Sequence, residues 1–418
     1  MPPVSSQRGA TLVVTLILFF AMTLTAAYAN RNHVFEQRAS ANQVRSSQAF
    51  EAAEAGIEWA VAMLNDPHGV RAGPAGRVDA VASFRDRHLR ADPATGEQRP
   101  VTWRRDGADV PLRAACVRRG GAWHCDCPSQ GEPVLAPDAD GNVTPAFSVA
   151  FATGPSARLV GLVALGCSDL DRPCAPDREP GAPGSARVQV TLGLIPGLAT
   201  APVAPLTTKD AVRASGAIGL HNVDAEVGGV ALHAGGGLLA PHARITTSPG
   251  GPLSHAVAEG DDRLHALDGE QLFMSVFGLD KASWKQHPAL ARVECRGECS
   301  ATMKQAVGPA SAHRMVWVDG ELQLDGPITL GAPERPVIVV AAGAVHLRGP
   351  VTVHGVVHGS RLTWNGAGAG AVVRGAALSE GGYEGDGAPD FVYDSGLLAA
   401  LKTGTGSFAR LPGSWRDF

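Results

Sequence analysis

Seven cysteines carry the most specific chemistry that the sequence offers, because they stand in small local groups. Such groups in an exported chain predict disulfide bonds. The groups are Cys116, Cys125 and Cys127; then Cys167 and Cys174; then Cys295 and Cys299. We expect bridges Cys167–Cys174 and Cys295–Cys299, each closing a short loop, and a bridge from Cys116 to either Cys125 or Cys127. The odd number leaves one thiol over.

Metal binding is the alternative chemistry for one cysteine group and for three histidines. The run His124-Cys125-Asp126-Cys127 lacks a second ligand pair at zinc-like spacing, so disulfides are favoured there. Two-residue alternation would place His346, His354 and His358 on one face of a strand, where they could hold a metal. A solvated polar face is the simpler interpretation, because the aliphatic residues around them would point inward: Val345, Leu347, Val351, Val353 and Val357.

An acidic loop and three tryptophans complete the candidates. The loop carries Glu380, Glu384, Asp386 and Asp390, which could hold calcium loosely, but a solvated turn is favoured. We expect three tryptophans to pack in the core or between coils rather than to form a sugar-binding surface: Trp284, Trp317 and Trp364. No H-E-x-x-H, G-x-S-x-G or G-K-[ST] motif occurs. We therefore predict no catalytic residue, no metal and no cofactor.

The composition indicates a turn-rich protein built mainly of strands. Gly (51) and Pro (30) supply 81 of the 418 residues, and both are poor helix formers, which disfavours a plain helical bundle. The net charge of −4 gives no electrostatic case for nucleic acid. The length allows two to three domains.

The N-terminus departs from that average. Residues 10–30 read ATLVVTLILFFAMTLTAAYAN, without a charge, between Arg8 and Arg31. This length spans a bilayer as a helix. A cleaved secretory signal peptide is the competing interpretation, since residues 26–29 (AAYA) resemble its cleavage site.

The helical pattern continues beyond the apolar run. Residues 30–66 contain no Pro and only one Gly, and Asn65-Asp66-Pro67 supplies a stop. An apolar stripe recurs at steps of three and four residues: Phe50, Ala53, Ile57, Ala60 and Leu64. We predict one helix from residue 10 to 65, lipid-compatible in its first half and amphipathic in its second.

The remaining chain predicts two β-rich parts, so that the fold class is α+β, mainly β. Residues 67–205 contain strand-like runs and predict a small antiparallel head on which the amphipathic half of the helix packs. From residue 206 to 418, short strands punctuated by Gly suggest a β-solenoid-like domain, with a helical insert at 264–291 and a closing helix at Ser395 to Lys402 that caps one end. Residues 324–330 repeat at 347–353, an offset of 23, and residues 354–357 echo 374–377, an offset of 20.

Two N-terminal motifs carry a resemblance to a known family. The first is Gln7-Arg8-Gly9-Ala10, a basic leader ending in Gly before the apolar run; the second is the box QAFEAAEAGI at residues 48–57. Together they resemble PilX-type minor pilins of type IV pili. The resemblance implies a leader over residues 1–9, cleavage between Gly9 and Ala10 by prepilin peptidase, and methylation of the mature chain.

The resemblance also implies a role. The fifth mature residue is Val14, where most pilins have a Glu thought to pair with a neighbour's N-terminal amine, and this favours a minor or tip-proximal subunit. An assembly helix would bury apolar residues against other pilins: Val14, Leu16, Ile17, Leu18, Phe19 and Phe20.

Partners and location follow from the same resemblance. The implied partners are major and minor pilins, the inner-membrane assembly platform and prepilin peptidase, with no nucleic acid. The implied location is the inner membrane with a periplasmic head, then the pilus at the cell surface, with a possible part in adhesion. The alternatives are a membrane-anchored β-helix polysaccharide lyase or hydrolase, and a secreted adhesin.

Overall fold

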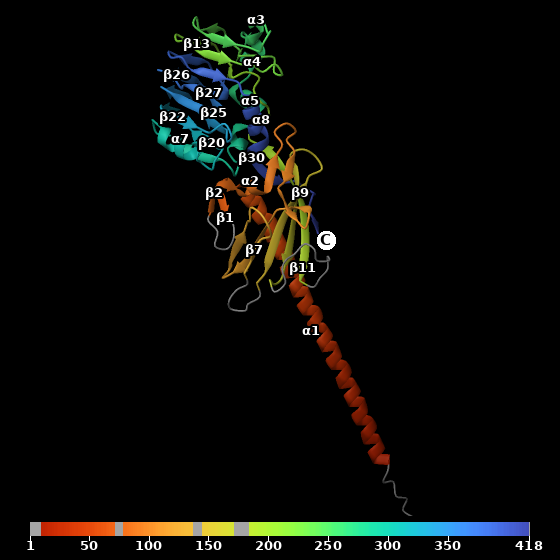
Figure 1. The fold of residues 1–418 in the computed structure, drawn as a ribbon. Coiled ribbons are helices and arrows are strands. Elements are labelled where there is room, and N and C mark those ends of the chain that lie inside the picture. The colour runs from red at the N-terminus through yellow and green to blue at the C-terminus, as the bar shows by residue number, and fades with distance from the viewer. Residues whose placement is uncertain (1–9, 72–77, 137–143, 171–183, 418) are drawn as a thin grey trace, which may run out of the picture.

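The computed structural model describes residues 10–71, 78–136, 144–170 and 184–417. Helix α1 (Ala10–Asn65) is a single helix of 56 residues, about 80 Å long at 1.5 Å per residue. Figure 1 shows it as a rod whose first part projects free of the body and whose last part lies within the head. The predicted continuous helix is therefore confirmed, with its end at the Asn65-Asp66-Pro67 stop.

The head is a seven-stranded antiparallel sheet crossed by the end of α1. Its strand order is β30-β11-β10-β9-β7-β8, and β31 also pairs with β11. The strands are β7 (Arg113–Arg119), β8 (Ala122–Asp126), β9 (Ala146–Thr153), β10 (Leu159–Cys167), β11 (Ser185–Pro196), β30 (Gly406–Arg410) and β31 (Arg416–Asp417). Helix α1 contacts β9, β10 and β11, as the amphipathic stripe predicted.

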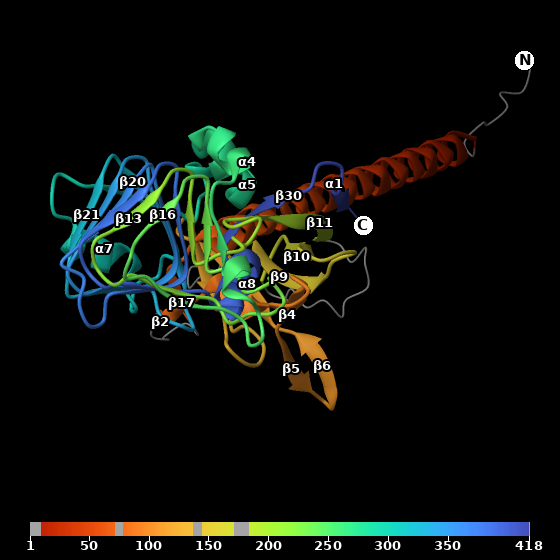
Figure 2. The same cartoon turned by 90° about the horizontal axis from the view of Figure 1, so that it is seen from above.

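Short elements connect the helix to this sheet. They are β1 (Gly69–Arg71), β2 (Val78–Ser83), α2 (Phe84–His88), β3 (Leu89–Ala91), β4 (Gln98–Pro100), β5 (Thr102–Arg105) and β6 (Ala108–Pro111). The hairpin of β5 and β6 projects from the body in Figure 2. Helix α2 is capped by the Ser83 side chain, which accepts from the Asp86 backbone N–H, and it lies where the head meets the second part of the molecule (Figure 1).

The second part is a stack of parallel strands, the pairing of a β-solenoid. One sheet contains β12 (Leu206–Thr208), β14 (Gly219–His221), β15 (Leu232–Ala234), β17 (Arg244–Thr246), β18 (Val257–Ala258), β19 (Ala291–Glu294), β20 (Met315–Asp319), β22 (Ile328–Leu330), β23 (Val337–Ala341), β25 (Val351–Gly359), β27 (Val372–Ser379) and β29 (Asp390–Val392). The facing sheet contains β13 (Val212–Ala214), β16 (Leu238–Leu239), β21 (Leu322–Asp325), β24 (Val345–Arg348), β26 (Leu362–Asn365) and β28 (Tyr383–Gly385).

The two sequence repeats match the strand register. Leu324 pairs with Leu347 and Ile328 with Val351, the offset of 23. Gly355 pairs with Gly375, the offset of 20. Each coil therefore places equivalent apolar side chains above one another, and these fill the space between the two sheets.

The coils are not stacked in chain order. The first coil contains β13, which pairs with β28 of the last coil on one side and with β16 of the second coil on the other. After β18 the chain returns to the far end of the stack, where β19 begins the remaining coils. Helices α4 (Asp262–Ala266), α5 (Gly269–Phe277) and α6 (Lys281–Trp284) lie on this return path. The predicted insert is thus the connection between opposite ends.

Two expectations about the C-terminal part are corrected. Helix α8 (Ser395–Gly404) does not cap an end; it contacts β25 and β27 on the side of the stack, because its Leu397, Leu398 and Leu401 join an apolar cluster there. Helices α3 (Leu253–Ala256) and α7 (Ser300–Val307) contact the terminal strands instead. Residues 406–417 leave the solenoid and complete the head sheet as β30 and β31.

Candidate functional site: the long helix and its seat

The free part of α1 exposes large apolar side chains to a degree that water does not favour. The exposed fractions are 54% for Val14, 64% for Leu16, 62% for Ile17, 54% for Leu18, 73% for Phe19 and 65% for Phe20. Burying one such side chain contributes about 1.5–3 kcal/mol. Within the described residues, α1 is a helix apolar and long enough to cross a membrane. It therefore requires lipid or other apolar helices around it.

The polar groups within this apolar segment are satisfied by the helix itself. The Thr15 hydroxyl donates to the Thr11 carbonyl at 2.9 Å, and the Thr23 hydroxyl donates to the Phe20 carbonyl at 2.9 Å. Such bonds remove hydroxyl donors that lipid could not satisfy. No carboxylate precedes Glu36 in the helix, and Val14 stands at its exposed start.

The buried end of α1 is made of small residues. Ala49, Ala52, Ala53 and Ala60 are at most 3% exposed, and Gly56 is also buried. We call these five residues the helix seat. A Cβ placed on Gly166 of β10 would lie 2.0 Å from the Ala49 carbonyl oxygen and 2.4 Å from the Ala53 nitrogen. The helix backbone therefore rests directly on the strand, which explains why residues 48–57 are rich in Ala and Gly.

The acidic residues of the same segment hold the C-terminal strands. Glu58 pairs with the Arg410 guanidinium at 2.6 Å, and Glu54 accepts from the Trp415 indole N–H at 2.6 Å. Asn65 makes two hydrogen bonds to the Phe408 backbone, at 2.8 and 2.9 Å. Because these contacts join residues more than 300 positions apart, periodicity in the helix gave no signal of them.

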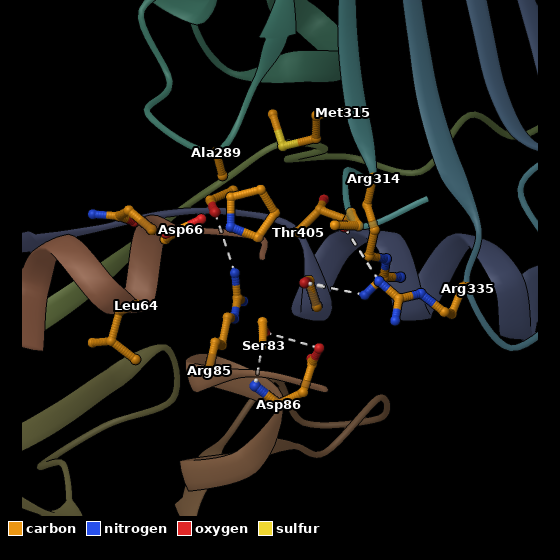
Figure 3. A pocket seen from close by; sticks show the side chains of 15 residues that line it. Leu64, Asp66, Ser83, Arg85, Asp86, Ala289, Arg314, Met315, Arg335 and Thr405 are labelled. Atoms are coloured by element: carbon orange, nitrogen blue, oxygen red, sulfur yellow. Dashed lines mark hydrogen bonds between the residues drawn. The ribbon is translucent and has the colours of Figure 1, made fainter. Parts of the chain in front are cut away.

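The junction of head and solenoid contains a group of arginines (Figure 3). Arg85 of α2 donates to the Gly406 carbonyl at 3.2 Å, and Arg314 donates to the Gly404 carbonyl at 3.3 Å. Burial, with the second guanidinium nearby, lowers the pKa of Arg85 to about 10. Burial likewise lowers the pKa of Arg314 to about 10. No sequence motif marked these residues.

The cysteines follow the disulfide interpretation where the structure describes them. Cys116 and Cys125 are opposite each other on β7 and β8 and form a bridge, and Cys295 bonds to Cys299. Cys127 is the buried free cysteine, and burial raises the pKa of its thiol to about 12. Cys174 lies outside the described residues, so its pairing with Cys167 stays a prediction. No group of three metal-ligating side chains occurs within the described ranges.

The three histidines do not share a face, and this expectation was wrong. His346 belongs to β24 in one sheet, whereas His354 and His358 belong to β25 in the other. A solvated face is also wrong for His358, which is 1% exposed because α5 covers it with Phe273 and Phe277.

The acidic loop does not converge on a cation. Glu380 pairs with Lys281 at 2.6 Å and with His358 at 3.1 Å. Burial alone would raise the pKa of Glu380, but the hydrogen bonds from His358 and Lys281 lower it to about 2. Asp390 pairs with Arg244 and His221.

The other two acids have their own neighbours. Glu384 lies 3.9 Å from Arg361, and Asp386 accepts from the Gly366 N–H. The loop residues thus have separate partners, in agreement with a turn. The three tryptophans are core residues as expected, with Trp284 and Trp364 fully buried and Trp317 5% exposed.

Comparison with known proteins agrees with the helix and its seat. The family model described as PilX N-terminal matches residues 8–58, which span the apolar segment and the seat. Among solved structures, the crystal structure of the competence-associated pilin ComZ from Thermus thermophilus is 14% identical, with 90% of this chain and 98% of that chain covered and a TM-score of 0.24. That TM-score does not establish a common fold. No curated protein matches the chain significantly.

The class of protein follows from these observations. A single helix serves both as an apolar segment compatible with one membrane anchor and as part of the core of a β head. Over residues 8–58 the chain is similar to the PilX N-terminal family, which supports a type IV pilin-like protein.

Proposed function

We propose that this chain is a minor pilin, a structural subunit of a type IV pilus rather than an enzyme. The proposal rests on one observation: the exposed apolar part of α1 continues without a break into the buried helix seat. A simple membrane anchor needs no such continuity, because a flexible linker would suffice. A subunit whose helix packs in a bundle does need a continuous helix, because the helix then fixes the position of the head relative to the bundle.

Processing and location follow from the same role. Prepilin peptidase cleaves between Gly9 and Ala10, and the helix then holds the chain in the inner membrane with the head in the periplasm. On assembly the helix leaves the lipid and packs among major and minor pilins at the assembly platform. Exposing one of these large apolar side chains to water instead would cost about 1.5–3 kcal/mol, so the helix should pass directly from lipid to the other pilins.

A position at the tip is supported by the place of the solenoid. The solenoid lies at the end of the molecule opposite the free part of α1 (Figure 1). In a filament of parallel, staggered helices, this end faces the subunit ahead, so a large domain there obstructs further packing. The absence of a carboxylate at Val14 supports the same role, and we expect the purified protein not to form filaments alone. An exposed domain at a tip is suited to adhesion.

A pair of matched variants tests the proposal. Leu18 and Leu239 are similarly exposed, at 54% and 56%, but Leu239 lies on the solenoid. A charge within an apolar bundle or bilayer costs about 2.5 kcal/mol or more. Leu18→Asp should therefore abolish incorporation into pili, whereas Leu239→Asp should leave it unchanged, as measured by immunoblotting of sheared pilus fractions. Normal piliation and pilus-dependent behaviour in a deletion strain would contradict the proposal.

A further inference from the structure

A small cavity lies where the head meets the solenoid, and it has an excess of positive groups. It holds about 50 Å³ and is lined by the end of α1, by α2, by the start of β20 and by the turn after α8. Figure 3 shows Arg85 entering from the head and Arg314 and Arg335 from the solenoid. Asp66 and Asp86 are the carboxylates of the lining.

The two acids have other hydrogen-bond partners, although the charge of Asp86 acts on both Arg85 and Arg314. Asp66 lies 2.6 Å from the His68 ring, and Asp86 accepts from the Ser83 hydroxyl at 2.9 Å. Within the described residues, neither Arg85 nor Arg314 has a carboxylate oxygen within ion-pair distance. Their bonds go to backbone carbonyls: Arg85 to Thr403 and Gly406, Arg314 to Pro336 and Gly404. Carbonyls at the end of α8 offer partial negative charge, but a guanidinium has five donors and each of these uses only some of them.

We propose that this cavity binds one small tetrahedral oxyanion, inorganic phosphate or sulfate, between Arg85 of the head and Arg314 of the solenoid. Guanidinium groups present paired N–H donors that match the oxygens of such an anion. A bound anion would also place a full negative charge in direct contact with the two partly buried cations, on which Asp86 acts only from beyond ion-pair distance.

The size of the cavity limits the ligand. A water molecule needs about 10–15 Å³ of such volume, so 50 Å³ accommodates a few waters or one oxyanion. A nucleotide or an extended sugar phosphate does not fit. Because one arginine comes from each side, the anion would join the head to the solenoid and stiffen the junction. This role is independent of whether the protein is a minor pilin.

Thermal unfolding of the full chain in detergent tests the site. At constant ionic strength, replacing chloride with phosphate or sulfate should raise the Tm with a saturable dependence on concentration. Glycerol phosphate should have a smaller effect, since its glycerol group exceeds the cavity. Arg85→Gln and Arg314→Gln should each remove the saturable shift. Arg348→Gln, which changes an exposed arginine of β24, should retain it.

Chemical modification of the unaltered protein provides a second readout that does not depend on variant folding. Phenylglyoxal reacts with guanidinium groups, and peptide mass spectrometry reports each site. Phosphate should slow modification of Arg85 and Arg314 at least fivefold and leave Arg348 unaffected. Equal modification rates with and without phosphate, or a Tm shift that is linear in salt and identical in the two variants, would overturn the proposal.

Discussion

The head and the solenoid bury their sheets in different ways. In the head, α1 supplies small residues that let its backbone rest on β10, and aromatic residues such as Phe84, Phe147 and Phe151 fill the surrounding space. In the solenoid, side chains of two facing sheets fill the interior, most of them aliphatic, and helices α3 and α7 contribute to it only at the two ends of the stack. The head therefore depends on a helix whose other half is apolar and exposed, whereas the coil interior is formed almost entirely by the coils themselves.

Lowering the pH should destabilise the head more than the solenoid, and this is the largest difference that we expect between the two regions. His88 of the head is 1% exposed and His287 beside β30 is 7% exposed. Burial lowers the pKa of each to about 4, below an ordinary value of about 6.5. The unfolded chain takes up these protons first, so stability is complete above pH 6.5 and declines as the pH falls to 4, by up to about 3 kcal/mol per histidine.

Hydrogen exchange at pH 7 and pH 4 checks this expectation. Protection should fall first in the head sheet and later between the two solenoid sheets. Within the solenoid, the contact of α5 with β25 should loosen first, because the buried His358 of β25 lies under α5 and burial lowers its pKa. His88→Leu should reduce the acid sensitivity of the head, whereas His346→Gln on the exposed side of β24 should not. Simultaneous loss of protection in both regions would contradict the distinction.

The contact between the helix seat and Gly166 of β10 should tolerate no added atoms. In Gly166→Ala the new Cβ meets the α1 backbone, which cannot move as a flexible side chain would, and we expect destabilisation of the head by about 3 kcal/mol or more. Gly368→Ala in the solenoid is the matched control, because nothing lies within 4 Å of its added Cβ. Calorimetry of both variants measures the difference, and equal melting profiles would refute the close approach of helix and strand.

A smaller effect is expected from the solenoid disulfide. Cys295–Cys299 closes a short loop beside α7 at one end of the stack. The chain-entropy relation gives about 2 kcal/mol for a loop of this length, and only the terminal coil should loosen. In the Cys295→Ser/Cys299→Ser variant, exchange should rise around α7 and remain unchanged in the head. A loss of protection throughout the chain would show that the bridge stabilises the whole fold.

The sequence predicted those features that depend on local or repeated patterns. The spacing of Ala53, Ile57 and Ala60 predicted the packed face of α1, and the offsets of 23 and 20 predicted the coil register. The same patterns contain no information on which coil follows which in space. They therefore gave no indication that the first coil lies beside the last.

Contacts between distant segments were equally hidden. Arg410 and Trp415 meet Glu58 and Glu54 only because the chain returns to the head after the solenoid. His358 became buried because the return path of α5 covers its strand. Alternation along a single strand cannot reveal such a cover, which is why the histidine face was misjudged.

The mature N-terminus of the membrane-extracted protein tests the central claim most directly. If the chain is processed and assembled as a pilin, intact-mass analysis and Edman sequencing will show Ala10 as the first residue, with the apolar part of α1 retained. Gly9→Leu should block this cleavage, because a bulky side chain replaces the small residue at the processing site. A mature chain beginning near Asn30 would mean removal of the apolar segment as a signal peptide and would contradict the account.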